Sequence, residues 1–485
     1  MIFFIYPIYY KMSALPKTVD YSRNIDHASK YKTLQVPLSN NSAISVAPVT
    51  NTSQLLQWKL PAGVTFNLSR STISYNILVD APAAPDAMFA VIADDCFQIA
   101  NQLSLVTAQG ITVADVPFCN RYTKLADKYF TRHSEFMSRA NVDMSYPRRT
   151  DNANIPISQV PAASMGAAGS DPNTYELPVN TNQIEGFVSW EEPRYYKVGP
   201  NINTSLSVAK YQKLGDVGKG TLFEHDKDLY YGQEIYLNLQ TAPVDNWAFR
   251  SIAQNEMDPF TANSIKFNAA GKVSITNIML NLAVEDNAVL ANSVRQKYET
   301  SGIKLRTDYI LAFRNVCNNS LTNINLQIPQ MAGTKIKRIM NCVYNSNETG
   351  ANTFDCHNLN GEKITTYQTT IDSQTLQNAF VDCTFSTGKR IGNTDYRENE
   401  KYVKDSVIQT VPMYQYNWVH IDSFDGDDSL KENHQNRDYG LDLDVPRNYL
   451  LQLNTPNAPV TNFAEYSFCI LSRVLHIGKD GIMFV

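Results

Sequence analysis

The sequence predicts a mostly β protein, all-β apart from a few short helices, built from two large modules. Its 485 residues exceed what one hydrophobic core ordinarily organises, so two domains are expected. Tyrosine, threonine, valine and isoleucine suit a pleated sheet, while the abundant asparagine, with proline, glycine and serine, suits many turns. Short runs that alternate apolar and polar residues recur along both halves of the chain, as half-buried strands do.

The stretch 272–316 stands between the two β-rich halves. Val273 and Ile275 alternate with polar residues, and from Ile278 the alternation resumes on the opposite parity. A slip of one residue exchanges the two faces of a strand, so we predict a β-bulge near Asn277. One module is expected to close on this strand.

A linking helix is expected next, over 286–302. Leu290, Val294 and Tyr298 recur every four residues, Asp286 can cap the N-terminus, and Gly302 suits the left-handed position that ends many helices. A new strand then opens the second module, and one of its faces carries Tyr309, Leu311 and Phe313.

The first half is organised around one helix and one long irregular segment. Residues 1–42 are expected to form an N-terminal arm, which is polar, irregular and mildly basic from residue 11. A helix is predicted between Asn120 and Met137, whereas 148–182 has no period and is expected to be a long surface loop. Strands are predicted at 44–49, 54–60, 64–79 and 235–239, with a hairpin around Gly110.

The second half of the chain is also predicted to consist mainly of strands. The run from Phe468 to Ile477 is almost continuously apolar, which is typical of a strand buried on both faces. Residues 1–10 and 482–485 are apolar ends, which we expect to contact neighbouring chains. The alternative for the first of them is an upstream extension of a chain that naturally begins at Met12. Strands are predicted at 309–316, 321–328, 335–344, 363–371, 414–424, 441–443, 449–453 and 466–477, and a short helix at 395–404.

Composition narrows the possible functions. The net charge of −5 gives no electrostatic reason to expect nucleic-acid binding over the whole surface. Seven scattered cysteines, without a Cys-x-x-Cys pair, favour free thiols over a disulfide framework or a zinc site. Residues 1–10 are too short to span a bilayer and lack the basic region of a signal peptide, and no transmembrane segment is expected elsewhere.

Three patterns were considered for chemistry. His420 and Asp422 point the same way on a strand, but no nucleophile elbow or zinc motif accompanies them, so we interpret them as structural. The segment Gly215–Thr221 fails the spacing of a phosphate loop and is expected to be a hairpin. The acidic loop at 422–428 does not match an EF-hand, and we expect a solvated turn, with a cation site as the alternative. No catalytic residue, metal ligand or cofactor is predicted.

Several motifs, taken in order, resemble the double jelly-roll major capsid proteins of Polinton-like viruses and virophages, within the adenovirus-like lineage. The resemblance extends over about residues 45–485 and is weaker in the first half, where Gly110-Ile111 and Phe118–Tyr122 carry it. In the second half it is carried by Lys363–Thr369, Leu376-Gln377, Asp395–Tyr402, Tyr414–Asp422, Gly440–Leu443, Arg473–Ile477 and Asp480–Ile482.

The resemblance implies two consecutive eight-stranded jelly-roll sandwiches, at 43–285 and 303–485. It also implies a structural protein, not an enzyme, that assembles inside the host cell as pseudo-hexagonal homotrimers into the icosahedral capsid of a double-stranded DNA virus. The implied partners are further copies of the chain, a penton protein for the five-fold vertices, and minor or cement proteins. The alternative is a β-sandwich spike or penton protein that binds a receptor or glycan.

Overall fold

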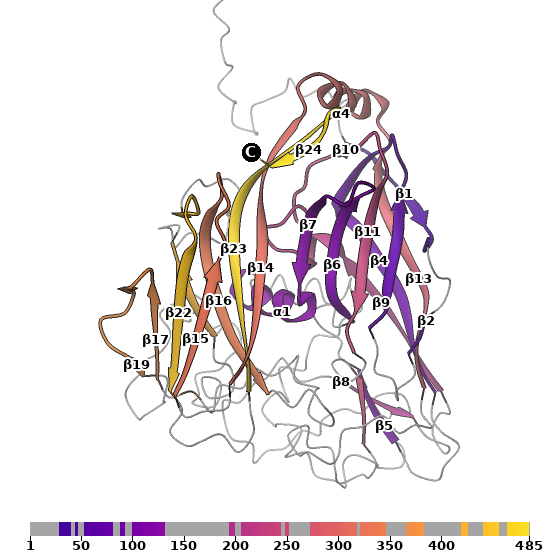
Figure 1. Cartoon of the computed structure of the whole chain (residues 1–485). Coiled ribbons are helices and arrows are strands. Elements are labelled where there is room, and N and C mark those ends of the chain that lie inside the picture. The colour runs from indigo at the N-terminus through magenta and orange to yellow at the C-terminus, as the bar shows by residue number, and fades with distance from the viewer. Residues whose placement is uncertain are drawn as a thin grey trace, which may run out of the picture.

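The computed structural model describes residues 29–39, 44–46, 53–80, 88–92, 99–130, 194–198, 205–243, 248–251, 272–317, 321–345, 364, 366–382, 419–424, 440–454 and 463–484. They form two antiparallel β-sandwiches that lie side by side (Figure 1). The helices among them are α1 (Cys119–Phe130), α3 (Leu214–Val217) and α4 (Ala288–Thr300).

The first sandwich pairs a larger sheet with a smaller one. The larger sheet has the order β1-β13-β4-β10, with β2 beside β13 and β9 beside β4; the smaller has the order β3-β11-β6-β7. A separate small sheet has the order β12-β5-β8. The strands are β1 (Tyr31–Val36), β2 (Ile44–Val46), β3 (Leu55–Leu60), β4 (Thr65–Asp80), β5 (Met88–Ile92), β6 (Ala100–Thr107), β7 (Thr112–Pro117), β8 (Arg194–Val198), β9 (Ser205–Lys213), β10 (Leu229–Tyr230), β11 (Ile235–Thr241), β12 (Ala248–Ser251) and β13 (Lys272–Glu285).

The second sandwich has an inner sheet, beside the first sandwich, and an outer sheet. The inner sheet has the order β14-β23-β16-β20, with β21 beside β16 and β24 beside β23. The outer sheet has the order β15-β22-β17-β18, with β19 beside β17. The strands are β14 (Ile303–Cys317), β15 (Leu321–Ile328), β16 (Lys335–Asn345), β17 (Thr366–Ile371), β18 (Gln374–Thr375), β19 (Val381–Asp382), β20 (Val419–Ser423), β21 (Leu441–Asp442), β22 (Arg447–Asn454), β23 (Phe463–Gly478) and β24 (Gly481–Phe484).

The inner sheet is buried on both faces, as predicted from its continuous apolar run. On β23, Phe468 and Ile470 join the apolar cluster of the first sandwich, whereas Cys469 and Leu471 join the core of the second. Alternate residues of a strand point to opposite faces, so this strand needs apolar side chains on both. By contrast, β11 alternates buried with half-buried residues and packs one face only.

The predicted bulge and most of the predicted linking helix are confirmed. Asn277 has a φ of 52°, and the register between β13 and β4 shifts between Thr276 and Met279. Gly302 follows α4 with a φ of 71°, and its amide donates to the Lys297 carbonyl, as in a left-handed helix end.

The predicted N-cap of α4 is wrong by one residue. Asn287 is the cap, because its side-chain oxygen accepts a hydrogen bond from the amide of Val289. Asp286 instead forms an ion pair with Lys32 of β1 at 2.9 Å. That contact attaches the edge strand of the larger sheet to the start of the helix.

Two other expectations are wrong. Residues 31–36, expected within an irregular arm, form β1, which pairs along β13 from Tyr31↔Glu285 to Val36↔Leu280. Residues 214–217, expected in a hairpin, form the buried helix α3. The C-terminal end forms β24, where Ile482 is buried in the chain's own core but Met483 and Phe484 are exposed, so its contact with neighbouring chains stays a prediction. Residues 1–10 lie outside the described residues.

The remaining element predictions agree with the structure wherever it describes them. The hairpin around Gly110 joins β6 and β7, and α1 begins one residue before the predicted helix. The predicted loop at 148–182 and helix at 395–404 lie outside the described residues.

Candidate functional site

The pair singled out in the sequence, His420 and Asp422, lies on the inward face of β20, inside the second sandwich. His420 Nε2 is 2.9 Å from Asp422 Oδ1, and both side chains are buried. The ring of Tyr367 packs against the imidazole, with the two ring centroids 4.3 Å apart. The predicted shared orientation is therefore confirmed, and the imidazole is enclosed by the chain's own side chains.

Asp422 is held as a carboxylate. Burial alone would raise its pKa, but the charge of His420 and its hydrogen bond, with further hydrogen bonds from Tyr449 and Thr369, bring the pKa below the usual value. The Tyr449 hydroxyl donates to Asp422 Oδ2 at 2.8 Å, and Gln377 Nε2 lies 3.3 Å from Oδ1. These donors satisfy the carboxylate, as a structural role requires.

Further polar residues, which the sequence did not indicate, extend this site across the core. Asn341 Nδ2 donates to the Tyr449 hydroxyl at 2.8 Å, and Ser467 Oγ lies 2.8 Å from Asn341 Oδ1. Ser467 Oγ is also 2.5 Å from Glu465 Oε1, and Asn315 Nδ2 donates to Glu465 Oε2 at 3.0 Å. We call the series Asp422, Tyr449, Asn341, Ser467 and Glu465 the core relay.

The core relay connects the two sheets of the second sandwich. Tyr449 belongs to β22 in the outer sheet, whereas its two hydrogen-bond partners, Asn341 and Asp422, belong to the inner sheet. Each of these partners comes from a different strand of that sheet. No sequence signal could have joined them, because Asn341 and Ser467 are 126 positions apart.

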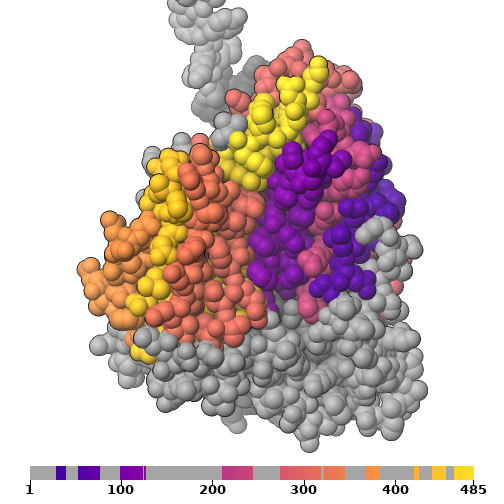
Figure 2. Space-filling model, in the orientation of Figure 1, coloured from indigo at the N-terminus to yellow at the C-terminus, as the bar shows by residue number. Residues whose placement is uncertain are grey.

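The two sandwiches meet along a seam of aromatic and polar contacts. Phe118 packs edge-on against Tyr466 with ring centroids 5.1 Å apart, and Arg121 lies 4.3 Å from the same ring. Arg473 Nη2 donates to the Val113 carbonyl of β7 at 2.9 Å. Its guanidinium lies between the rings of Tyr309 and Phe484, at 4.2 and 3.8 Å from their centroids. Figure 2 shows the C-terminal strands on this face, beside residues of the first sandwich.

The segment that follows α3 is part of this seam. The Tyr122 hydroxyl donates to the Lys219 carbonyl at 2.9 Å, and Thr123 Oγ1 donates to the Val217 carbonyl at 2.8 Å. The Asp308 amide of β14 donates to the Gly220 carbonyl at 2.9 Å. Asp308 also forms a buried ion pair with Lys337 at 2.6 Å. The segment considered as a phosphate loop thus carries buried structural contacts.

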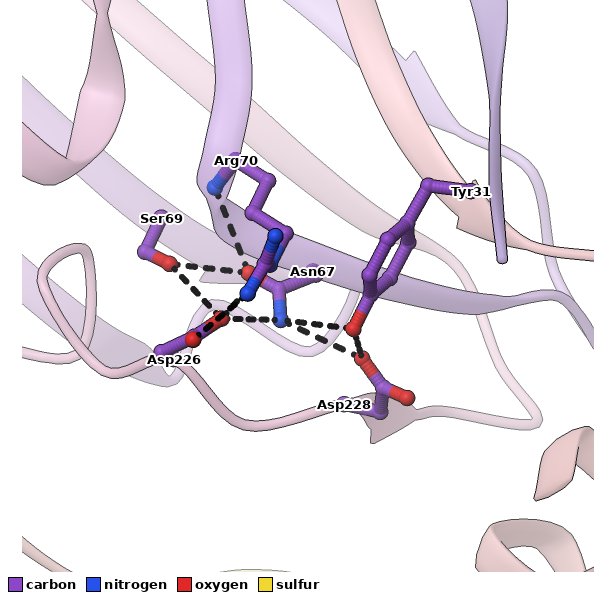
Figure 3. A network of polar contacts seen from close by, with 6 residues as sticks. All are labelled: Tyr31, Asn67, Ser69, Arg70, Asp226 and Asp228. Atoms are coloured by element: carbon purple, nitrogen blue, oxygen red, sulfur yellow. Dashed lines mark hydrogen bonds and ion pairs between the residues drawn. The ribbon is translucent and has the colours of Figure 1, made fainter. Parts of the chain in front are cut away.

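A second polar network lies at the edge of the first sandwich (Figure 3). Arg70 binds both oxygens of Asp226, each at 2.8 Å, and the Tyr31 hydroxyl donates to Asp228 at 2.8 Å. Asn67 Nδ2 lies between the two carboxylates, at 3.0 Å from Asp226 and 3.2 Å from Asp228. We call this set the edge network. It fastens β1 and the 226–228 segment to β4.

Within the described ranges there is no group of three or more histidine, cysteine, aspartate or glutamate side chains placed to hold a metal ion. The four described cysteines, Cys119, Cys317, Cys342 and Cys469, are buried free thiols. Most of the acidic loop, 425–428, lies outside the described residues. That this chain has no catalytic, cofactor or metal site stays a prediction.

This chain is similar to known proteins in structure but not in sequence. No family model and no curated protein matches the sequence. The Faustovirus major capsid protein matches with a TM-score of 0.57 and 10% identity, over 93% of this chain and 91% of that chain. A chain in the structure of the Sputnik virophage matches with a TM-score of 0.54 and 11% identity, over 100% of this chain and 93% of that chain.

The chain has the double jelly-roll fold. The predicted fold class is thereby confirmed, since the matches extend over both sandwiches. In this double jelly roll the seam fixes one sandwich against the other, and the core relay and the edge network stabilise one sandwich each. Among the described helices, none is long and apolar enough to cross a membrane.

Proposed function

We propose that this chain is a major capsid protein, which assembles into the icosahedral shell of a double-stranded DNA virus and resides in the virion. The observation that carries the proposal is the fold, which is that of the Faustovirus major capsid protein over nearly the full length of both chains. The proposal makes the protein a structural one, without catalytic activity. It also takes 43–285, extended by β1 at 31–36, and 303–485 as the two jelly-roll domains, with 286–302 as the linking helix.

The capsomer is proposed to be a homotrimer. Three copies of a chain with two similar sandwiches supply six sandwiches, so a trimer has a nearly hexagonal outline that can tile a curved sheet. Such tiling requires the two sandwiches to keep one relative orientation, and the contacts of Arg473, Tyr466 and Asp308 along the seam support this. A trimer cannot fill a five-fold vertex, so a separate penton protein and minor or cement proteins are proposed as partners.

Light scattering and negative-stain electron microscopy of the purified full chain test this function. We expect oligomers that form closed shells or curved sheets under some condition of salt and pH. A second arm of the test uses the seam variant Arg473→Met. It keeps an unbranched side chain on Tyr309 and Phe484 but removes the hydrogen bond to the Val113 carbonyl. Since this bond is one of the contacts that hold the two sandwiches in one orientation, we expect the variant to fold but to give fewer regular particles.

A monodisperse monomer at micromolar concentration, with no particles at any salt or pH tested, would contradict the capsid function. Saturable binding of a glycan by isolated oligomers that never form particles would favour a receptor-binding spike instead.

A further inference from the structure

Glu465 is an acidic side chain in the interior of the second sandwich that the proposed function does not use. It lies on β23 with no solvent exposure and faces the core between the two sheets. Its two oxygens meet Ser467 and Asn315, which are neutral. Among the described residues it forms no ion pair. An ionised carboxylate buried without a cation is expensive, so its protonation state becomes a structural question.

Counting protons along the core relay answers that question. The relay has four contacts: Asp422 with Tyr449, Tyr449 with Asn341, Asn341 with Ser467, and Ser467 with Glu465. The tyrosine hydroxyl and the serine hydroxyl each supply one proton, and the asparagine amide supplies one, because only its nitrogen side donates. Turning the amide round moves its proton to the other neighbour without adding one. Three protons cannot complete four hydrogen bonds.

The fourth proton must come from a carboxyl group at one end of the relay. Asp422 is stabilised as the anion by His420 at 2.9 Å. Glu465 has no such basic partner among the described residues, and its Oε1 lies 2.5 Å from the Ser467 hydroxyl, which can accept. We infer that Glu465 holds this proton in the folded chain, and that its release to solvent is a pH-sensitive switch that removes one hydrogen bond from the relay connecting the two sheets.

The electrostatics support this assignment. Burial raises the pKa of Glu465 to about 7, against lowering by the hydrogen bonds of Ser467 and Asn315. The titratable groups around it are Cys469 on its own strand, Cys317 on β14 and Tyr449 on β22, with Asp422 and His420 of β20 at the far end of the relay. Burial is the main cause that raises the pKa of each thiol and of Tyr449, and the charge of Glu465 adds to it. None of these three groups therefore offsets an anionic Glu465.

When Glu465 ionises, the Ser467 proton must turn toward the carboxylate, and the relay loses one of its other three contacts. If the Asn341 amide keeps its orientation, the lost contact is the one between Ser467 and Asn341; if the amide turns round, it is one of the contacts of Tyr449. The switch thus weakens the relay that joins the outer sheet to the inner sheet. Because the group binds its proton more tightly when folded than when open, opening of the second sandwich becomes easier as the pH rises from 4.5 toward and through 7.

Pulse labelling of buried thiols in the full chain, followed by peptide mapping, tests this switch. Cys469 reports opening beside Glu465, and Cys119 of α1, which is equally buried in the first sandwich, is the internal reference. With dilute reagent, the ratio of Cys469 to Cys119 labelling should rise about tenfold in the wild type between pH 6 and 8.5. This rise follows from a Glu465 pKa of about 7 in the folded chain and of 4.5 in the opened chain.

The decisive variant is Glu465→Gln, whose amide can donate to Ser467 and accept from Asn315 as the neutral acid does. It should give a labelling ratio that does not change with pH. Glu299→Gln is the control, since it removes the same charge from an exposed ion pair with Arg295 and should behave as the wild type. A wild-type ratio that stays constant, or a Glu465→Gln ratio that rises as much as the wild type, would overturn the inference.

A spectroscopic readout needs no variant. In wild-type chain carrying ¹³C-carboxyl glutamate, isotope-edited infrared spectroscopy should show a protonated carboxyl band at pH 6 that disappears by pH 8.5. Absence of that band at pH 6 would equally overturn the inference. Neither experiment depends on shell formation, so a failure here is distinguishable from a failure of the proposed function.

Discussion

The two sandwiches each contain a polar network that connects strands, but the two networks differ in their exposure to solvent and in whether each acid has a cation beside it. The edge network of the first sandwich is open to solvent, with Arg70 and Asp226 about half exposed, and its main acid has a cation bound at both oxygens. The core relay of the second sandwich is buried, and one of its two acids, Glu465, has no cation.

This difference teaches where electrostatics count in a double jelly roll. An exposed ion pair is screened by water and contributes little, whereas a buried carboxyl group must be satisfied by specific donors or remain protonated. The first network should therefore tolerate substitution and respond to salt. The second should be intolerant of substitution and respond to pH.

The largest effect is expected for Asp422→Ala. Removing this carboxylate leaves the buried His420 without its acidic partner and Tyr449 without its acceptor. The free energy of unfolding should fall by about 3–5 kcal/mol, the usual cost of breaking a buried pair. Urea denaturation followed by tryptophan fluorescence measures this loss. A loss below about 1 kcal/mol would show that the relay is not a structural unit.

The pH dependence of the wild type should be the next largest effect. Burial raises the pKa of Glu465 from 4.5 to about 7, so the folded chain binds one proton more than the unfolded chain between these values. Its contribution to stability is greatest below pH 4.5 and is lost as the pH rises through 7. Between pH 5 and 8 this group should cost about 2–3 kcal/mol. The same pH series on Glu465→Gln should lack this component.

A pair of tyrosine variants compares the two networks directly. Tyr449→Phe removes a hydroxyl that serves both Asn341 and Asp422, and should cost about 1–3 kcal/mol because both partners stay buried. Tyr31→Phe removes the hydroxyl that donates to Asp228 at the edge, where water can replace it. Its cost should be below about 1 kcal/mol. Equal costs in denaturant titrations would remove the distinction between the networks.

The smallest effect is expected for Asp226→Ala. The hydrogen bond to Arg70 is the main cause that lowers the pKa of Asp226, but both groups are open to solvent. The loss should be at most about 1 kcal/mol and should shrink further in high salt. Denaturation at low and high ionic strength tests this, and a cost that does not change with salt would mean that the ion pair is better shielded than its exposure indicates.

The sequence predicts the architecture well where a local pattern is sufficient. The burial of β23 on both faces follows from its unbroken apolar run. The bulge at Asn277 follows from the slip of one residue in the alternation of apolar and polar residues. Strand β1 was missed because four of its six residues, from Lys32 to Gln35, are exposed, so an edge strand leaves no alternating pattern. Helix α3 was missed because Gly215 resembles a turn residue. In the fold its small size is required, since a Cβ there would lie 2.7 Å from the Ser69 carbonyl oxygen.

The candidate site was predicted only in its local part. His420 and Asp422 are two residues apart on one strand, so strand geometry alone places their side chains together. Asn341 is 108 positions from Tyr449, and the register between β16 and β23 places Asn341 beside the Glu465 end of the relay. Tyr449 belongs to the other sheet, so only the packing of the two sheets brings it to Asn341. Their protonation depends on burial, which a sequence pattern does not specify.

The central proposal, that two sandwiches in one chain serve to build a capsomer, is tested most directly by single-particle cryo-electron microscopy of the purified oligomer. We predict a three-fold particle with six sandwich-shaped lobes in a nearly hexagonal outline and a mass three times the 54.5 kDa of one chain. A particle with one double jelly roll, or a closed dimer without three-fold symmetry, would contradict the proposal.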